Sequence, residues 1–128
     1  MIVAGVGCRR GAPAADIEAA IRAALARANL SADALGMIAT IAAKSAEAGV
    51  RKAAEKFGVV VVPVPETEIK AASHRTETRS ARVLALIGVP AVAEAAALAA
   101  AGPAARLICR RLVVGAATCA LAASGAAT

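Results

Sequence analysis

Two arginines lie between glycines near the start of the chain, in the stretch GVGCRRG at residues 5–11. The guanidinium groups of Arg9 and Arg10 can bind a carboxylate or a phosphate through two parallel hydrogen bonds. Glycines permit a tight turn, and a helix start directly after the turn adds a partial positive charge. We therefore expect an anion-binding loop over residues 7–11. The candidate ligand-binding residues of this stretch are Gly5, Gly7, Cys8, Arg9, Arg10 and Gly11.

The stretch fits neither of two common nucleotide-binding motifs. After Gly5 and Gly7, a dinucleotide-binding fingerprint requires its third glycine at position 10, which is Arg10. A Lys-Ser or Lys-Thr pair, as in a P-loop, does not follow the glycines. The structural alternative is a tight turn between a strand and a helix that carries two solvated arginines. The residues alone leave both interpretations open.

Cys8 and Glu94 are the candidates for a catalytic side chain. Cys8 lies beside Arg9 at a predicted helix start, and both features lower the pKa of a thiol. A nucleophile also needs a base, and nothing in the sequence brings the single histidine, His74, to Cys8. We expect Cys8 to be a small packed residue, His74 to lie in a surface loop, and Glu94 to be a charge at a helix start. No cluster of residues has metal-ligand spacing, so we expect neither a metal nor a cofactor.

Composition restricts the partners and the compartment. Fifteen Lys and Arg residues against nine Asp and Glu residues give a net charge of +6, which favours an anionic partner. Phe57 is the only aromatic residue, so a surface that stacks nucleic-acid bases is not expected. Three cysteines without a CxxC spacing indicate a reduced, cytoplasmic setting. No basic region precedes Ile2–Val6, and the alanine-rich stretch 89–101 is shorter than the roughly 20 residues of a membrane span, so neither a signal peptide nor a membrane partner is expected.

Segments typical of strands and helices alternate along the chain, which predicts one three-layer α/β/α domain over residues 1–128 with a mixed, mostly parallel sheet. The first three strands are expected side by side, and the last two are expected to form a hairpin at Gly115. The unbroken run Val59–Val64 is expected to be buried on both faces. The predicted strands are 1–6, 37–41, 59–64, 106–114 and 116–121, the predicted helices are 13–28, 45–57, 78–88 and 90–102, the flexible loop is 66–75, and the frayed tail is 122–128.

Three segments resemble a known family. GVGCRRG is similar to the N-terminal signature of the CobE / CbiG C-terminal family of cobalamin (vitamin B12) biosynthesis. Residues 88–98, GVPAVAEAAAL, are similar to that family's GVPSVAEAAAL. Near the end, Thr118-Cys119-Ala120 follows Arg111 where the family has a lysine, a short turn and a Thr-x-Ala strand. The segments lie in the family's order, and the length matches the free-standing member, CobE, rather than the longer CbiG.

The resemblance implies a ligand with many carboxylates. The family acts on corrin-ring precursors, and a precorrin carries acetate and propionate groups around an apolar macrocycle. Charge-assisted hydrogen bonds to Arg9 and Arg10 could hold several of these groups, and the matching positions add Arg110, Arg111 and Thr118. Arg110 or Arg111 replaces the family's lysine, which keeps the charge but removes any role in proton transfer. Ala91 replaces the serine of a capping box, so half of that box is lost.

These observations lead to a first hypothesis and two alternatives. The first is a protein that binds or carries a precorrin, a tetrapyrrole intermediate, through its carboxylates, together with other enzymes of the cobalamin pathway as possible partners. The alternative is a hydrolase that acts on a precorrin lactone, as the resemblance to CbiG implies. If the resemblance is set aside, the composition leaves a small basic module that binds nucleotides or RNA.

Overall fold

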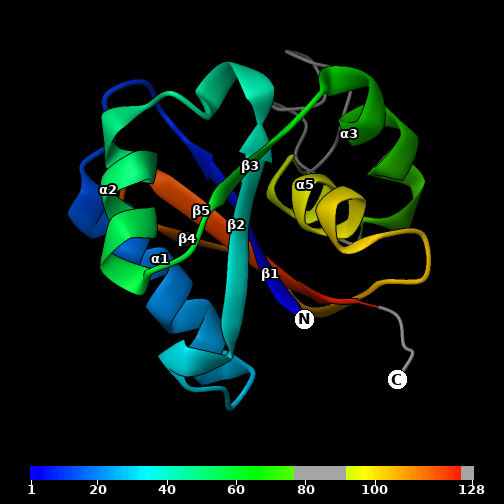
Figure 1. The fold of residues 1–128 in the computed structure, drawn as a ribbon, viewed down its shortest axis with the longest axis horizontal. Coiled ribbons are helices and arrows are strands. Elements are labelled where there is room, and N and C mark those ends of the chain that lie inside the picture. Colours follow the sequence, from blue (N-terminus) through cyan, green and yellow to red (C-terminus); the bar gives the residue numbers. More distant parts are fainter. Residues whose placement is uncertain (77–91, 125–128) are drawn as a thin grey trace.

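The computed structural model describes residues 1–76 and 92–124 and shows a five-stranded sheet between two layers of helices (Figure 1). Helices α1 and α2 cover one face of the sheet, and α3 and α5 cover the other. This arrangement confirms the predicted three-layer α/β/α fold. The strands are β1 (Ile2–Cys8), β2 (Leu35–Ile41), β3 (Val61–Val64), β4 (Arg106–Val114) and β5 (Ala117–Ala123), and the helices are α1 (Ala14–Arg27), α2 (Ala48–Phe57), α3 (Glu66–Ala72) and α5 (Val92–Ala101), with short 3-10 turns η1 (Ala32–Ala34), η2 (Ala42–Lys44) and η3 (Ser73–Arg75).

The strands lie in the order β3-β2-β1-β5-β4. β1 pairs in parallel with β2, and β2 in parallel with β3, so the first three strands are side by side as predicted. β5 pairs antiparallel with both β1 and β4. Of the strands described, β5 therefore runs opposite to the other four, and the two parallel and two antiparallel pairings confirm a mixed sheet. The turn at Gly115, where φ is +56°, joins β4 and β5 into the predicted hairpin.

The side chains of β1 alternate between the two layers of helices. Ala4 and Val6 belong to the core formed with α1 and α2, and Val3 belongs to the core formed with α5. Gly5 faces α5, and a Cβ atom at this position would collide with the carbonyl oxygen of Ala93 and the Cβ of Ala97. Glycine on the strand and alanines on the helix thus allow α5 to pack unusually close to the centre of the sheet.

The run Val59–Val64 does not form a strand buried on both faces, as the sequence predicted. β3 begins only at Val61 and lies at the edge of the sheet, and Val60 is 66% exposed. Ile38 donates its N–H to the carbonyl oxygen of Val60 at 3.0 Å, so the even-numbered residues of this run direct their backbone groups toward β2. Pro63, which has no N–H, accordingly faces outward, where a missing donor breaks no ladder hydrogen bond.

Two segments predicted to be irregular have regular structure. Residues 66–75, expected as a flexible loop, form α3 and η3. Ile69 is fully buried under this helix, and Glu66 and Lys70 form an ion pair of 3.1 Å one turn apart. Ala122 and Ala123, which were predicted to belong to a frayed tail, lie in β5, where Ala122 is fully buried opposite Val3.

Other predictions fall outside the described residues: the helix over 78–88, the starting residues Pro90 and Ala91 of the next helix, and the tail from residue 125. No helix within the described ranges is long and apolar enough to cross a membrane.

Candidate ligand-binding site

The loop that follows β1 begins later than the sequence predicted. The strand does not end at Val6 but continues through Gly7 and Cys8, because β5 pairs with both residues. The loop therefore covers residues 9–13 at the carboxyl edge of the parallel strands, where ligands bind in open α/β sheets. We call it the β1–α1 loop.

The β1–α1 loop presents its two arginines to solvent. Arg9 and Arg10 are exposed, and among the described residues no carboxylate pairs with either guanidinium group. The backbone below them is fixed, because Arg9 donates its N–H to the carbonyl oxygen of Ala116 at 3.1 Å and accepts a hydrogen bond from the N–H of Ala12 at 3.0 Å. Two exposed cations thus extend from a turn whose backbone is hydrogen-bonded.

A carboxylate of the protein already occupies part of this loop. Gly11 donates its N–H to Oε1 of Glu47 at 2.8 Å, across 36 positions of the sequence. Glu47 lies between η2 and α2, after the carboxyl end of β2, the strand adjacent to β1. Sequence reasoning did not select Glu47. The signal that could have found it is its place in the loop after the neighbouring parallel strand, since such loops meet at one edge.

A second carboxylate holds the β4–β5 hairpin next to the loop. Asp16, in the first turn of α1, accepts a hydrogen bond from the N–H of Ala116 at 3.0 Å through Oδ2. The carboxylate also lies where a Cβ at Gly115 would be, so this turn requires glycine for space as well as for its positive φ. The first turn of α1 is therefore already used by an acidic side chain of the protein.

Cys8 is half-buried and packs against the core on the α1 side. Burial raises the pKa of its thiol; Lys44 opposes this shift by its positive charge, and Glu47 adds to it by its negative charge. The expectation that Arg9 and the start of α1 would lower this pKa is thus wrong, because desolvation dominates. The predicted packed position of Cys8 is confirmed. His74 is exposed in η3, which belongs to the α3 and α5 layer on the other side of the sheet.

Glu94 is the other catalytic candidate, and it is fully buried in the first turn of α5. Its Oε2 accepts a hydrogen bond of 2.8 Å from the backbone N–H of Arg111 on β4. The ladder between β4 and β5 is irregular here: Cys109 pairs with Leu121 and Leu112 with Cys119, so two residues of β4 lie opposite Ala120 alone. This β4 bulge consists of Arg110 and Arg111, and Glu94 supplies the acceptor that the displaced N–H of Arg111 requires.

The remaining candidate residues lie between the loop and the bulge. Thr118 donates its hydroxyl to the carbonyl oxygen of Gly7 at 3.3 Å and faces the α5 side of the sheet. Gly5 is buried beneath α5 and is a packing residue within the strand rather than part of an open loop. Arg110 is exposed and Arg111 is partly exposed. The candidate residues thus form two groups, the β1–α1 loop and the β4 bulge, separated by β5 and linked through Gly7 and Thr118.

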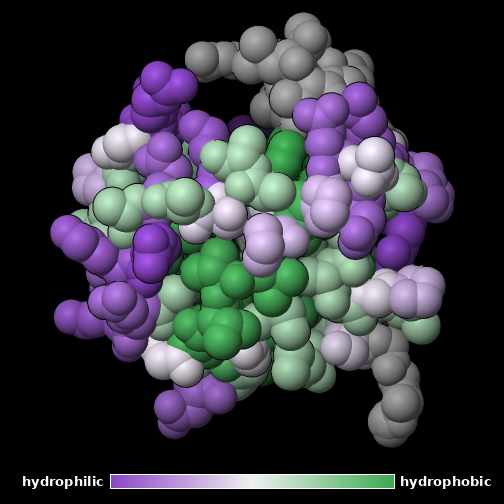
Figure 2. Space-filling view, turned by 45° about the horizontal axis from the view of Figure 1, so that its top comes forward, coloured by the Kyte–Doolittle hydropathy of each residue, from purple (hydrophilic) through white to green (hydrophobic). Residues whose placement is uncertain are grey.

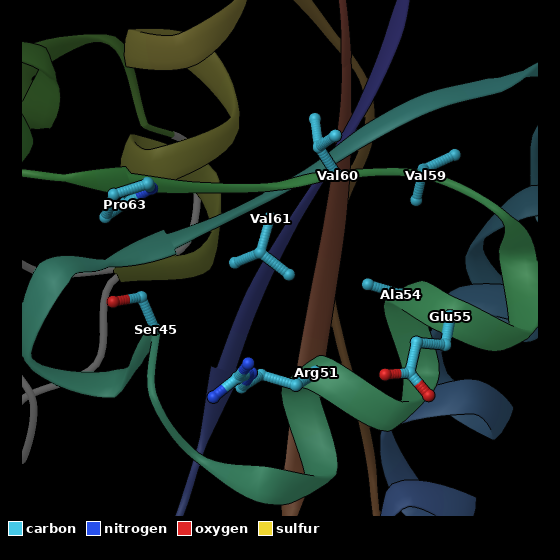
Figure 3. A pocket seen from close by; sticks show the side chains of 8 residues that line it. All are labelled: Ser45, Arg51, Ala54, Glu55, Val59, Val60, Val61 and Pro63. Atoms are coloured by element: carbon cyan, nitrogen blue, oxygen red, sulfur yellow. The ribbon is translucent and has the colours of Figure 1, made fainter.

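Two hollows of the described surface lie elsewhere. A groove of about 400 Å³ runs along the edge of β3, where Arg51 and Glu55 of α2 lie opposite the valines at positions 59–61 (Figure 3). On the face that carries β3, Figure 2 shows an apolar area framed by hydrophilic side chains. A second hollow of about 380 Å³ lies between α3 and the end of α5, beside His74. Neither is lined by a candidate arginine of the loop or bulge, so we assign the site by its chemistry rather than by its depth.

No group of three or more His, Cys, Asp and Glu side chains in residues 1–76 and 92–124 is placed to hold a metal ion.

Comparison with known proteins identifies the class of protein. The family described as "Cobalamin synthesis G C-terminus" matches residues 2–122, nearly the whole chain. The chain therefore belongs to this family of cobalamin biosynthesis proteins, as the three sequence segments indicated.

Individual relatives agree with the family match. The chain is 36% identical over 121 residues to Protein CobE of Sinorhizobium sp, covering 94% of this chain and 79% of that protein. The crystal structure of CobE, a protein from the cobalamin (vitamin B12) biosynthetic pathway, matches with a TM-score of 0.88 and 32% identity over 95% of this chain and 89% of the other. Cobalamin biosynthesis protein chiG from Agrobacterium tumefaciens str. C58 matches with a TM-score of 0.78 and 38% identity, covering 98% and 100%.

Proposed function

We propose that this cobalamin biosynthesis protein binds a precorrin intermediate through the carboxylates of the ligand and carries it without turnover. The observation that supports the proposal is a pair of exposed arginines on the β1–α1 loop, at the carboxyl edge of a sheet of this family, which form no ion pair with any carboxylate of residues 1–76 and 92–124. A guanidinium without an internal partner is free to form charge-assisted hydrogen bonds with an anionic ligand.

The β4 bulge gives the ligand a second basic contact region. Arg111 lies opposite Ala120, which pairs with Gly5, so the bulge is about four residue levels below Arg9 along the sheet and two strands across. At about 3.3 Å per residue and about 4.8 Å per strand, the two groups are about 13 Å apart in one direction and about 10 Å in the other. A ligand that carries carboxylates around a broad ring could contact both groups, whereas a small monocarboxylate could contact only one.

The side chains that surround the loop support binding without turnover. The raised pKa of the Cys8 thiol disfavours the thiolate that a nucleophile requires. His74 lies on the other side of the sheet, and Glu94 is fully buried and hydrogen-bonded to the backbone. The carboxylate near Cys8, Glu47, accepts the N–H of Gly11, and its negative charge helps to raise the pKa of the thiol rather than to form a thiolate. Among the described residues, this arrangement gives little support to the pair of nucleophile and base that hydrolysis by side chains needs.

The test is incubation with a panel of purified precorrin intermediates, followed by mass spectrometry of the bound and free species. The proposal expects a bound ligand of unchanged mass. Replacing Arg9→Ala together with Arg10→Ala should weaken binding about tenfold to a hundredfold, which corresponds to about 1.4–2.8 kcal/mol. Lys52→Ala with Lys56→Ala, on the exposed face of α2, removes the same charge away from the loop and should change affinity much less.

Three outcomes would contradict the proposal in different ways. Equal losses for the two double variants would show that only net charge matters. Release of a ligand that has gained the mass of water would favour the hydrolase alternative. Failure of every precorrin to bind, together with binding of RNA or a nucleotide, would favour the basic-module alternative.

A further inference from the structure

The side chain of Glu47 occupies a position that a ligand carboxylate would take in the β1–α1 loop. Its Oε1 accepts the N–H of Gly11 at 2.8 Å, directly after the two arginines. Negative charge on this carboxylate also contributes to the raised pKa of Cys8, which independently places it close to the end of β1. The loop therefore contains an anion of the protein itself where the sequence predicted a bound anion.

The backbone that carries Glu47 is fixed. The N–H of Glu47 donates to the carbonyl oxygen of Lys44 at 3.1 Å, and its carbonyl oxygen accepts the N–H of Arg51 at 3.1 Å. Gly49, two residues later, packs against the carbonyl oxygen of Ala12 so closely that a Cβ would not fit. The start of α2 and the β1–α1 loop thus form one packed unit, and only the side chain of Glu47 is free to leave Gly11.

The hydrogen bond between the Glu47 side chain and Gly11 is weak. Glu47 is partly exposed and Gly11 is exposed, and none of the described basic side chains forms an ion pair with this carboxylate. Water can therefore replace either partner when the hydrogen bond opens. While this hydrogen bond is open, the guanidinium groups of Arg9 and Arg10 remain free to bind an anion.

We propose that Glu47 is an internal competitor that an anionic ligand must displace from the N–H of Gly11. The inference rests on the proposed function, because it assumes that the β1–α1 loop binds ligand carboxylates. After displacement, Glu47 stays close as a negative charge and opposes every incoming anion. A ligand that engages both arginines and the bulge overcomes this repulsion, and an anion that meets the loop alone does not. Glu47 therefore selects for ligands with several carboxylates over simple monocarboxylates.

The probe for the test is uroporphyrin, a tetrapyrrole with eight carboxylates whose visible absorption reports binding. Glu47→Ala should bind it about three- to tenfold more tightly than the natural protein at low salt. Glu47→Gln should lie between the two, because the amide removes the charge but keeps an acceptor for Gly11. Glu55→Gln is the matched control: it makes the same charge change on α2, beside the groove at the edge of β3, and should change affinity less than twofold. Acetate should not compete with uroporphyrin for the natural protein, but should compete for Glu47→Ala.

A measurement on the unaltered protein avoids any effect of substitution on folding. In the natural protein, added uroporphyrin should shift the side-chain carboxyl carbon resonance of Glu47 together with the Gly11 amide resonance, because a ligand carboxylate then replaces Glu47 as the acceptor of this N–H. An unshifted Glu47 carboxyl resonance in the bound protein would overturn the inference. Tighter binding by Glu55→Gln and Glu47→Ala to the same extent would overturn the inference, as would unchanged or weaker binding by Glu47→Ala. If neither the natural protein nor Glu47→Ala binds any tetrapyrrole, the proposed function itself is wrong. If the natural protein binds and Glu47→Ala binds no better, only the role of Glu47 is wrong.

Discussion

Glu47 and Glu94 both accept a backbone N–H at 2.8 Å, yet they lie in opposite environments. Glu47 is partly exposed at the β1–α1 loop, whereas Glu94 is fully buried between α5 and the β4 bulge. Water can replace the first hydrogen bond but cannot reach the second. Two hydrogen bonds of equal length therefore have different roles. Glu94 fixes the shape of the β4 bulge, whereas Glu47 controls access to the β1–α1 loop.

The largest expected effect is the loss of the buried carboxylate. Glu94→Ala should reduce the free energy of unfolding by about 2–4 kcal/mol, because it leaves the N–H of Arg111 without its acceptor and creates a cavity. Urea unfolding would measure the loss. Glu94→Gln keeps the volume and an oxygen acceptor and should cost less. A loss below about 1 kcal/mol for Glu94→Ala would show that the bulge does not depend on this side chain.

Substitutions at two glycines compare the same two regions, because Gly5 packs against α5 and Gly11 lies in the β1–α1 loop. Gly5→Ala should cost about 2–3 kcal/mol, because α5 must move away from the new methyl group. Gly11→Ala should cost about 1 kcal/mol, since its φ of +74° is strained for alanine but nothing lies within 4 Å of the new atom. Thermal unfolding of both variants would rank them. A reversed order would contradict the view that α5 packs rigidly and the loop does not.

The pH dependence of stability in the alkaline range should test the burial of the Cys119 thiol. Cys119 is fully buried, and burial raises its pKa well above the ordinary value of 9.0. The unfolded chain ionises this thiol near pH 9 while the folded chain does not, so its contribution to stability is complete below that pH and decreases above it. Between pH 9 and pH 10 the free energy of unfolding should fall by about 1 kcal/mol more in the natural protein than in Cys119→Ala. Parallel curves for the two proteins would contradict this linkage.

The smallest expected effect is on the stability of the loop variant. Glu47→Ala should change the free energy of unfolding by less than about 0.5 kcal/mol, because its one side-chain hydrogen bond is replaced by water. The same urea series used for Glu94→Ala would measure it. A loss comparable to that of Glu94→Ala would show that Glu47 holds the loop together, and the contrast between the two carboxylates would disappear.

The sequence predicted the features of the fold that depend on local patterns. Alternating strand and helix segments gave the layers, and Gly115 gave the hairpin. The end of β1 was missed because Gly7 and Cys8 become strand only through pairing with β5, more than a hundred residues later. α3 was missed because its anchors, Ile69 and Ala72, are too few to produce a helical pattern and become decisive only when α5 packs over them.

The sequence suggested the candidate residues of the site but not the contacts that these residues make. The arginines and glycines of residues 5–11 can be recognised as anion-binding candidates in the sequence, because residue type alone suggests this chemistry. The partners of this loop could not, since Glu47 reaches Gly11 across 36 positions and Glu94 reaches Arg111 across 17. The β4 bulge and the contact between Glu47 and Gly11 both depend on how distant segments align in the folded protein. Composition does not specify this alignment.

The position of β1 has a consequence for synthesis. β1 is made before the other described strands and lies at the centre of the sheet, but one of its two neighbours is β5, the last strand described. A nascent chain that has not yet reached residue 117 can pair β1 with β2 but leaves its other side open, with the apolar residues of Ile2–Cys8 beside a row of free backbone groups. Such an edge pairs readily with other chains. Protection from aggregation on the ribosome therefore depends on prompt completion of the last hairpin, and chains that terminate early lack it entirely.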